Sequence, residues 1–284
     1  MENFDNIEFS TLKEVVIQLL QNTGYLVDLS TTGVATGFDK VDAITNGFQA
    51  GEVSAIASKP GNGRTAFLLS LLFNIASKSG KAVGVFSPER SATKMFYRLI
   101  ESETHQSIKK IRERELKDSD REQVNTNLYN LSKAEIYVDD SSQLKGEELK
   151  KRCCLMRKKY GVDIIFIDSF ELLCGSNTYL PTSMEEEMEV AILKDIKAVA
   201  KELDIPIVVL SHISNSAKLN LENNEPITNH VANHILENID SVYFILRDYR
   251  SDIAKFIIAK HKNITEKQEI ELKFIESIDK FVDK

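Results

Sequence analysis

The sequence contains few cysteines, no long apolar run and no excess of positive charge. Its three cysteines, Cys153, Cys154 and Cys174, form no CxxC pair, which argues against a zinc site and for a reducing compartment. No apolar run approaches the roughly 20 residues of a membrane-spanning helix. Residues 1–5 are acidic and lack the apolar core of a secretory signal. We therefore expect a cytoplasmic protein without a membrane partner.

The charge balance is acidic, with a formal net charge of −7 from 36 Lys and Arg against 43 Asp and Glu. Proteins that bind nucleic acid over a broad face are usually basic, because they must neutralise phosphates. Any contact with DNA would therefore use a local patch or the channel of a ring. The alternative is that the protein does not contact DNA.

Residues 1–32 are predicted to form an N-terminal arm. Thr11 and Glu14 have the spacing of a capping box, and the apolar residues between 12 and 20 follow at helical spacing. The polar stretch 28–32 is typical of a linker. An amphipathic helix isolated by a linker needs a partner surface, either in this chain or on another subunit.

Residues 33–284 are predicted to form one α/β domain, because strand-like and helical stretches alternate from Thr36 onward. Apolar strands with helical crossovers indicate a mostly parallel sheet flanked by helices on both faces. After Asp240, three strand-like segments with short turns predict a C-terminal antiparallel extension of the sheet. The predicted strands are 53–57, 82–86, 136–138, 164–167, 207–210, 242–246, 254–259 and 269–274, and the predicted helices are 65–77, 92–103, 120–131, 146–160 and 188–203.

A glycine-rich turn lies between the first predicted strand and the helix that follows it. It resembles the phosphate-binding motif G-x-x-x-x-G-K-[ST], with Ser in the place of the first Gly and Arg in the place of Lys. Its glycines would let backbone N–H groups surround a phosphate, and the threonine hydroxyl is a ligand that Mg²⁺ needs. Taken alone, the segment could equally be an ordinary strand-to-helix turn. Its residues are Ser58, Lys59, Pro60, Gly61, Asn62, Gly63, Arg64 and Thr65.

An aspartate that ends a later apolar strand favours the phosphate-binding interpretation. Asp168 follows the run 163–167 and would lie at the carboxyl end of a parallel strand, where α/β sheets bind ligands. In P-loop nucleotide hydrolases such an aspartate holds Mg²⁺, although a helix cap or turn residue is the other interpretation. The loop and the aspartate together, in this order, predict a nucleotide site with ATP and Mg²⁺ as cofactors.

Eight short segments, in the same order along the chain, resemble the ATPase domain of the DnaB-type replicative DNA helicases. The resemblance extends over about residues 9–281, and no segment is similar to the separate N-terminal helical domain of that family. It implies a RecA-like P-loop NTPase fold and an ATP-dependent helicase or translocase. It also implies self-association into a ring or hexamer, single-stranded DNA as a partner, and contacts with other replication proteins. The segments are 36–39, 58–65, 86–89, 136–142, 165–168, 198–203, 209–212 and 258–263.

The resemblance also assigns roles to individual residues. Glu89 stands at the position of the catalytic glutamate that polarises the attacking water, and its other interpretation is a surface carboxylate. His212 takes the position of a glutamine that senses the γ-phosphate; it could still donate a hydrogen bond, with a charge that depends on pH. Lys260 and Lys262 lie on the late strand that presents a lysine and an arginine finger to the ATP of the next subunit.

Several positions depart from the family pattern. Arg64 replaces a lysine, and Lys262 replaces an arginine, so that a planar bidentate group becomes a point charge. Ala232 stands where a DNA-facing loop of the family has an arginine, within the shortened stretch 230–234. The other central loop, 174–189, contains Glu185, Glu186, Glu187 and Glu189, which oppose DNA phosphates unless they form a solvated helix start.

The sequence is compatible with three interpretations of function. The first is an ATP-driven, ring-forming DNA helicase or translocase, which the intact Glu89 and Asp168 favour. The second is a catalytically degenerate module that binds nucleotide or DNA and regulates or co-assembles with an active helicase. Arg64, Lys262 and Ala232 favour this module. The third is a recombinase-type or clock-type RecA relative, against which the segment 139–142 argues.

Overall fold

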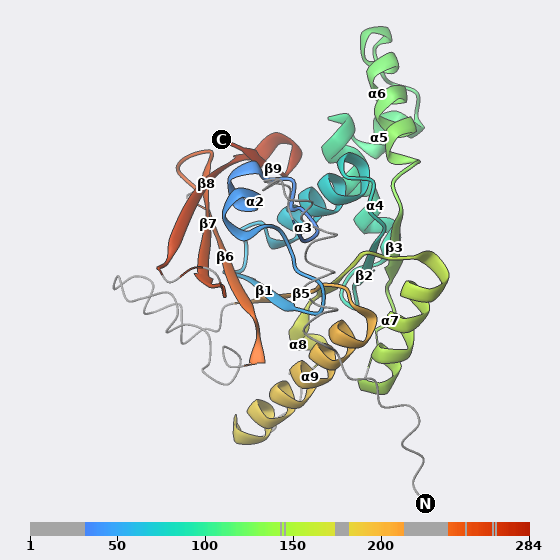
Figure 1. Ribbon diagram of the computed structural model, residues 1–284. Coiled ribbons are helices and arrows are strands. Elements are labelled where there is room, and N and C mark those ends of the chain that lie inside the picture. Colours follow the sequence, from blue (N-terminus) through green and yellow to red (C-terminus); the bar gives the residue numbers. More distant parts are fainter. Residues whose placement is uncertain are drawn as a thin grey trace, which may run out of the picture.

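The computed structural model describes residues 32–142, 144, 146–173, 182–212, 238–247, 249–262, 264 and 266–284, with only the backbone of Glu171, residues 182–186 and His212 (Figure 1). These residues form a nine-stranded sheet with the order β3-β2-β4-β5-β1-β6-β7-β8-β9. The predicted arm lies outside the described residues, apart from Thr32.

The first six strands of this order run parallel to one another. Their almost continuously apolar runs, which are largely buried in every strand except the edge strand β3, are typical of a parallel sheet that is covered on both faces. The strand β6 was predicted to begin the antiparallel extension, and it also pairs in parallel with β1. These strands are β3 (Ile136–Asp139), β2 (Val83–Phe86), β4 (Ile164–Asp168), β5 (Ile207–His212), β1 (Val53–Ser58) and β6 (Ser241–Arg247).

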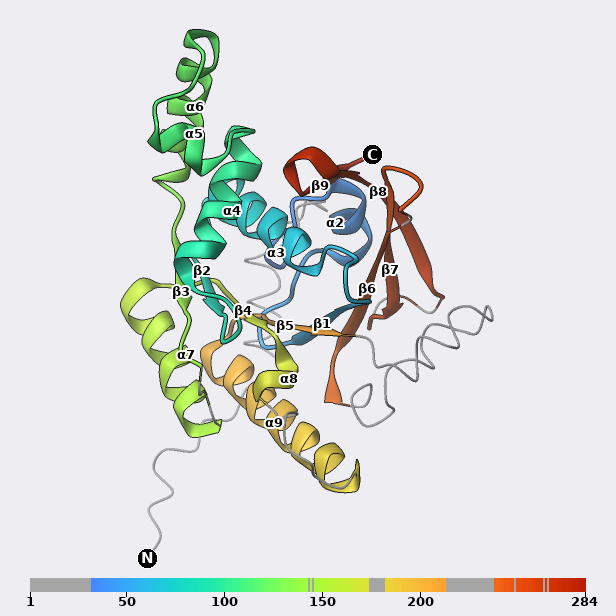
Figure 2. The same cartoon turned by 180° about the vertical axis from the view of Figure 1, so that it is seen from behind.

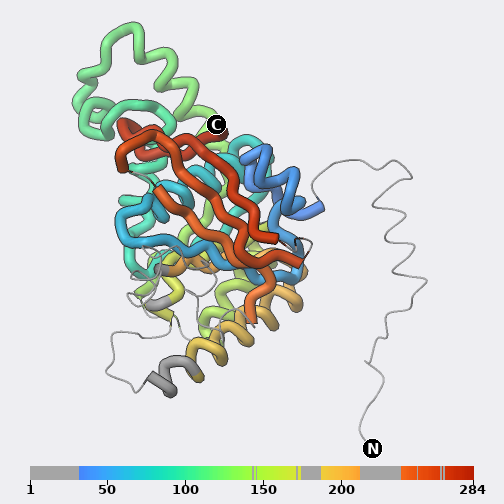
Figure 3. Tube along the Cα trace, turned by 90° about the vertical axis from the view of Figure 1, so that its left-hand side faces the viewer, coloured from blue at the N-terminus to red at the C-terminus, as the bar shows by residue number. Residues whose placement is uncertain are grey.

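The C-terminal strands extend the sheet in antiparallel fashion beyond β6 (Figure 3). They are β7 (Ile253–Lys260), β8 (Gln268–Ile275) and β9 (Lys280–Asp283). Buried and exposed residues alternate along β8, as expected for an antiparallel strand with one face in solvent. The strand β9 was not predicted. It is held by Phe281, which packs edge-on against Phe67.

Helices cover both faces of the sheet, as Figures 1 and 2 show from opposite sides. One face carries α2 (Asp39–Thr45), α3 (Arg64–Phe73) and α4 (Ala92–Thr104), and the other carries α7 (Gly146–Tyr160), α8 (Phe170–Leu173) and α9 (Thr182–Leu203). The helices α5 (Ile108–Arg112) and α6 (Asp118–Leu131) project away from this body. A short π-helix, η1 (Asn74–Lys78), follows α3, and a short 3₁₀ helix, η3 (Glu276–Ile278), follows β8.

Helix α3 is the central helix of the fold. Almost all of its residues are buried, including the polar Arg64, Thr65 and Ser70, so it is apolar nearly all round, as is typical of a core helix. It packs against the sheet and against β9, where Ser70 Oγ accepts a hydrogen bond of 3.0 Å from the backbone N–H of Phe281. This packing fixes the start of α3 against the end of β1.

The α/β fold with its mostly parallel sheet and antiparallel C-terminal strands is confirmed. The prediction that 174–189 is a loop is wrong for its second half, because α9 begins at Thr182. The acidic run therefore lies in the first turns of a helix, where carboxylates are favoured by the helix dipole. No helix among the described residues combines the length and the apolar character that crossing a bilayer requires.

A nearly buried ion pair joins β9 to α4 and provides a test of this packing. Lys280 Nζ lies 2.6 Å from Glu103 Oε2, and their side chains are 14% and 7% exposed. We expect Lys280→Ala to lower the free energy of unfolding by about 3–5 kcal/mol, because it leaves Glu103 buried without this counter-charge. Urea denaturation would measure the change.

The matched control is Lys284→Ala, which removes a lysine from a pair with Glu271 in which both side chains are about half exposed. This change should leave the urea midpoint almost unaltered. Equal midpoints for the two variants would contradict the account of β9 as a strand fixed to α4.

Candidate functional site

The glycine-rich turn connects the buried end of β1 at Ser58 to the first residue of α3, Arg64. Gly61 and Gly63 have φ angles of 86° and 84°, a region that glycine adopts at little cost and other residues rarely enter. The backbone N–H of Asn62 donates to the carbonyl of Lys59 at 3.1 Å. Two left-handed glycines in a short loop give the concave backbone that surrounds a phosphate.

The N-terminus of α3 completes this concave backbone. Its capping residue, Gly63, has no side chain that could bond the first N–H groups, and the first turn contains no acidic residue. Uncapped N–H groups and the positive end of the helix dipole favour an anion. Thr65, the predicted Mg²⁺ ligand, is buried in the same turn.

Two carboxylates face this loop from neighbouring strands. Asp168 ends β4 and is completely buried, and Glu89 follows the end of β2 by three residues, with 45% of its side chain exposed. The guanidinium of Arg64, which is 6% exposed, has Nη2 3.3 Å from Asp168 Oδ1 and 3.8 Å from Glu89 Oε2. The structure therefore brings together three residues that the sequence predicted for one site.

Two buried serines lie at the same edge of the sheet. Ser58 ends β1 and Ser87 directly follows β2. Neither Oγ has a hydrogen-bond partner among the described residues. Buried hydroxyls normally have a partner, so these two atoms fit a ligand that carries acceptors or donors. Ser87 was not predicted as a site residue, although it lies between a predicted strand and Glu89.

Tyr249 is a second residue that the sequence did not predict for the site. It lies in the turn between β6 and β7, and its hydroxyl donates a hydrogen bond of 3.1 Å to Asn62 Oδ1 in the loop. The Arg247 guanidinium lies 5.2 Å from the Tyr249 ring centroid. Because Tyr249 is 187 residues from Asn62, no local pattern in the sequence could connect them.

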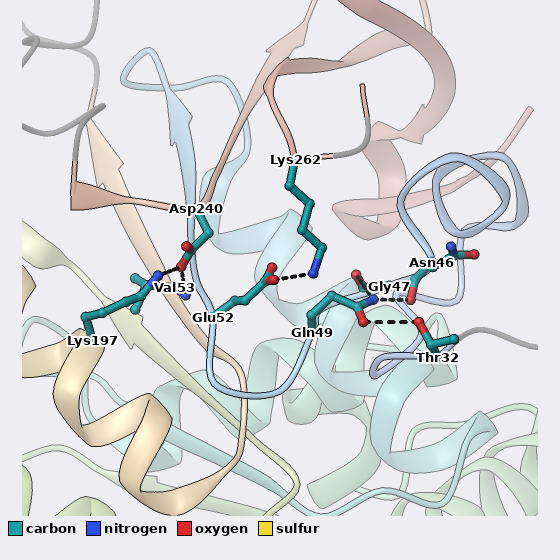
Figure 4. Close-up of polar contacts among 9 residues, drawn as sticks. All are labelled: Thr32, Asn46, Gly47, Gln49, Glu52, Val53, Lys197, Asp240 and Lys262. Atoms are coloured by element: carbon teal, nitrogen blue, oxygen red, sulfur yellow. Dashed lines mark hydrogen bonds and ion pairs between the residues drawn. The ribbon is translucent and has the colours of Figure 1, made fainter. Parts of the chain in front are cut away.

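Lys260 and Lys262 lie at the opposite edge of the sheet from the loop. Strand β7 runs antiparallel to β6, so Lys260 pairs with Val242 near the beginning of the parallel strands. The prediction that both lysines lie on this strand is wrong for Lys262, because β7 ends at Lys260. Figure 4 shows Lys262 paired with Glu52, which precedes β1.

A second ion pair lies at the same edge of the sheet. Lys197 of α9 pairs with Asp240, whose carboxylate also accepts a hydrogen bond of 2.8 Å from the backbone N–H of Val53 (Figure 4). The beginnings of β1 and β6 are thereby connected to α9. Lys262 and the glycine-rich loop therefore lie at opposite ends of β1.

The backbone of His212 lies beside Ser58, since the two residues are partners in the parallel pairing of β5 and β1. This places His212 at the predicted edge of the sheet, and its side chain lies outside the described part of the structure. The stretch 230–234 with Ala232, and residues 174–181 of the other predicted DNA-facing loop, also lie outside the described residues.

The described residues contain no group of three or more His, Cys, Asp or Glu side chains that could hold a metal ion. Mg²⁺ commonly takes one or two protein ligands and completes its shell with water and the phosphates of a nucleotide. Thr65 and Asp168 have the right donor chemistry for that kind of site, so the residues present fit a phosphate-bound Mg²⁺ and not a site built by protein alone.

A family model, the DnaB-like helicase C terminal domain, matches residues 33–283. The chain belongs to this family. The DnaB-like assignment agrees with the site. The ion pair of Arg64 with Asp168 connects the loop after β1 to the carboxylate that ends β4, at one edge of a RecA-like sheet.

Individual relatives support the DnaB-like assignment, and solved structures support the fold. The replicative DNA helicase DnaB of Geobacillus stearothermophilus is 30% identical over 285 residues, which cover 96% of this chain and 62% of that protein. A solved structure of an isolated ATPase domain has a TM-score of 0.83 at 22% identity, covering 98% of this chain and 100% of that one. A DnaB-like replicative helicase, solved in a study of its interactions with primase, has a TM-score of 0.79 at 23% identity. That match covers 97% of this chain and 67% of that one.

This chain therefore spans about three fifths of the length of the curated DnaB relatives that it matches. The two solved structures, at their low sequence identity, show the fold alone.

The space around Gly61 provides a test of the loop. A Cβ at Gly61 would lie 2.8 Å from the Tyr249 hydroxyl, whereas a Cβ at Gly80 would meet nothing within 4 Å, and both glycines have positive φ. We expect Gly61→Ala to weaken ADP binding by at least about tenfold, because alanine is strained at this φ and the loop itself must change shape. Calorimetric titration would measure the affinity.

Gly80→Ala is the control for backbone strain, since each alanine should cost about 1–2 kcal/mol of stability at such a φ. It should leave ADP affinity unchanged. If the two variants bound ADP equally well, the loop would not be the phosphate-binding element.

Proposed function

We propose that this chain is the ATP-binding and ATP-hydrolysing motor domain of a ring-forming DNA helicase or translocase that acts on single-stranded DNA in cytoplasmic DNA replication. The observation that carries the proposal is the convergence of the glycine-rich loop, the buried Asp168 and the half-exposed Glu89 at one edge of the sheet. Membership of the DnaB-like family supports it.

The phosphates of ATP would lie in the turn from Ser58 to Thr65. The backbone N–H groups of Gly61, Gly63, Arg64 and Thr65 and the buried Ser58 hydroxyl would bind phosphate oxygens, since the start of α3 has no side-chain cap. Thr65 and Asp168 would hold a Mg²⁺ ion, which supplies positive charge that neutralises the phosphates. Lys59, Pro60 and Asn62 form the rest of the turn.

Glu89 would orient and polarise the water that attacks the γ-phosphate. The Glu89 side chain is 45% exposed, whereas Asp168 is completely buried, so water can reach Glu89. A base must reach the water that it activates, so Glu89 suits this role better than Asp168. His212, whose backbone lies beside Ser58, would report the presence of the γ-phosphate to the DNA-facing loops.

Lys260 and Lys262 would act on the ATP of a neighbouring subunit. They lie at the edge of the sheet opposite the loop, so they cannot approach the phosphates held by their own subunit. A second copy placed with this edge against the loop would receive their charge, and a repeated head-to-tail contact of this kind closes into a ring. We propose a hexamer in which the predicted arm, residues 1–32, contacts a neighbour.

Other replication proteins are proposed as further partners, because a structurally similar DnaB-like helicase was solved in a study of its interactions with primase. A second candidate function is a module that binds nucleotide with little turnover and co-assembles with an active helicase. The observation that favours it is the pairing of Arg64 with both carboxylates. This pairing occupies the groups that hydrolysis requires.

Glu89→Gln tests the proposal through steady-state ATP hydrolysis with and without single-stranded DNA. We expect DNA to stimulate hydrolysis by the unaltered chain, and the variant to lose at least about 100-fold in turnover, as is typical when a general base is removed. Its affinity for ADP should stay the same, because Glu89 contacts water and not the β-phosphate.

The matched control is Glu113→Gln, since the Glu113 side chain is exposed to a similar extent, 47%, and pairs with Lys109 on the projecting helices. It should hydrolyse ATP at the unaltered rate. Tight nucleotide binding without turnover in the unaltered chain would support the regulatory module instead.

A further inference from the structure

We infer that Arg64 bridges Asp168 and the phosphates of the bound nucleotide. Arg64 thereby supplies part of the positive charge that a divalent cation supplies in other nucleotide sites. Nucleoside diphosphate would then bind with nearly the same affinity with and without Mg²⁺. The inference rests on the proposed nucleotide site and deepens it.

The position of Arg64 is the first observation. It is the first residue of α3 and directly follows the two left-handed glycines of the loop, so its backbone belongs to the phosphate-binding turn. Its side chain is nevertheless directed to the ends of β4 and β2, with Nη2 3.3 Å from Asp168 and 3.8 Å from Glu89. The guanidinium therefore lies on the path between the loop and the carboxylates.

Burial of the pair is the second observation. Asp168 is completely buried and Arg64 is 6% exposed. A buried carboxylate is costly unless a cation compensates it, and the guanidinium cannot lose its charge in a protein. Asp168 therefore has a permanent counter-charge before any metal ion arrives.

The chemistry of arginine allows one side chain to serve both partners. A guanidinium is planar and carries five N–H donors in a fork, so it can bond a carboxylate along one edge and a phosphate oxygen along another. A lysine ammonium in the same place is a point charge, and when it moves to the phosphates it leaves Asp168 without compensation. With lysine, a metal ion is then needed beside Asp168; with Arg64 that need is largely met.

The same charge would weaken the metal site. Mg²⁺ must approach a carboxylate oxygen to about 2.0–2.1 Å, and here it would lie close to a cation whose Nη2 is 3.3 Å from Asp168 Oδ1. Like charges this close repel each other, and they do so more strongly in a buried site than in water. Thr65 and Asp168 would therefore hold the metal ion less tightly than they would without this arginine.

The test compares ADP affinity in excess Mg²⁺ and in excess EDTA by calorimetry, for the unaltered chain and for Arg64→Lys. We expect EDTA to change the affinity of the unaltered chain by less than about tenfold, and that of Arg64→Lys by roughly 100-fold. The control is Arg121→Lys, which makes the same substitution in an exposed pair with Asp118 and should behave like the unaltered chain.

A second measurement uses Mn²⁺ in place of Mg²⁺ and follows the bound ion by electron paramagnetic resonance in the presence of ADP. We expect Arg64→Lys to bind Mn²⁺ more tightly than the unaltered chain does. If EDTA weakened ADP binding to the unaltered chain by 100-fold or more, the inference would be overturned while the proposed nucleotide site stood. If ADP bound under neither condition, the proposed function would fall together with the inference.

Should Arg64→Lys fail to fold, as near-ultraviolet circular dichroism would reveal, the comparison of Mg²⁺ and EDTA in the unaltered chain still decides the matter. That comparison requires no variant. A small effect of EDTA supports the bridging role of Arg64, and a large effect contradicts it.

Discussion

The buried contact between Arg64 and Asp168 connects the glycine-rich loop to the centre of the sheet. Asp168 ends β4, and Arg64 begins α3 after the loop that leaves β1. Because the carboxylate is completely buried, it requires a cation beside it. The position of Arg64 beside Asp168 therefore sets the direction of the first turn of α3. The uncapped N–H groups of that turn are thereby directed to the same edge of the sheet as Glu89.

The two edges of the parallel sheet carry different groups of functional candidates. The carboxyl edge holds the loop, Asp168 and Glu89, whereas the amino edge holds Lys262, which pairs with Glu52. A nine-stranded sheet that is continuous from β3 to β9 fixes the separation of the two edges. In the proposed ring, cations at the amino edge would serve a phosphate only on another copy of the chain, so that one ATP site would be built by two subunits.

Much of the architecture followed from the sequence, because the apolar strand runs and the helical spacing are local signals. The helix 146–160 and the loop Ser58–Thr65 were predicted where the structure has them. The strand β9 was missed because it is only four residues long and depends on Phe281 packing against Phe67. Contacts between distant residues, such as Tyr249 with Asn62, and the pairing of Lys262 with Glu52, have no local pattern. The roles of Glu89, His212, Lys260 and Lys262 stay predictions.

Hydrogen–deuterium exchange of the backbone amides, with and without ADP, tests most directly whether the turn from Ser58 to Thr65 binds phosphates. We predict that ADP slows exchange at the amides of residues 61–66, because these N–H groups become donors to phosphate oxygens. Amides of the projecting helix α6 should exchange at the same rate in both states. Unchanged exchange at residues 61–66, with protection appearing elsewhere in the chain, would contradict the account.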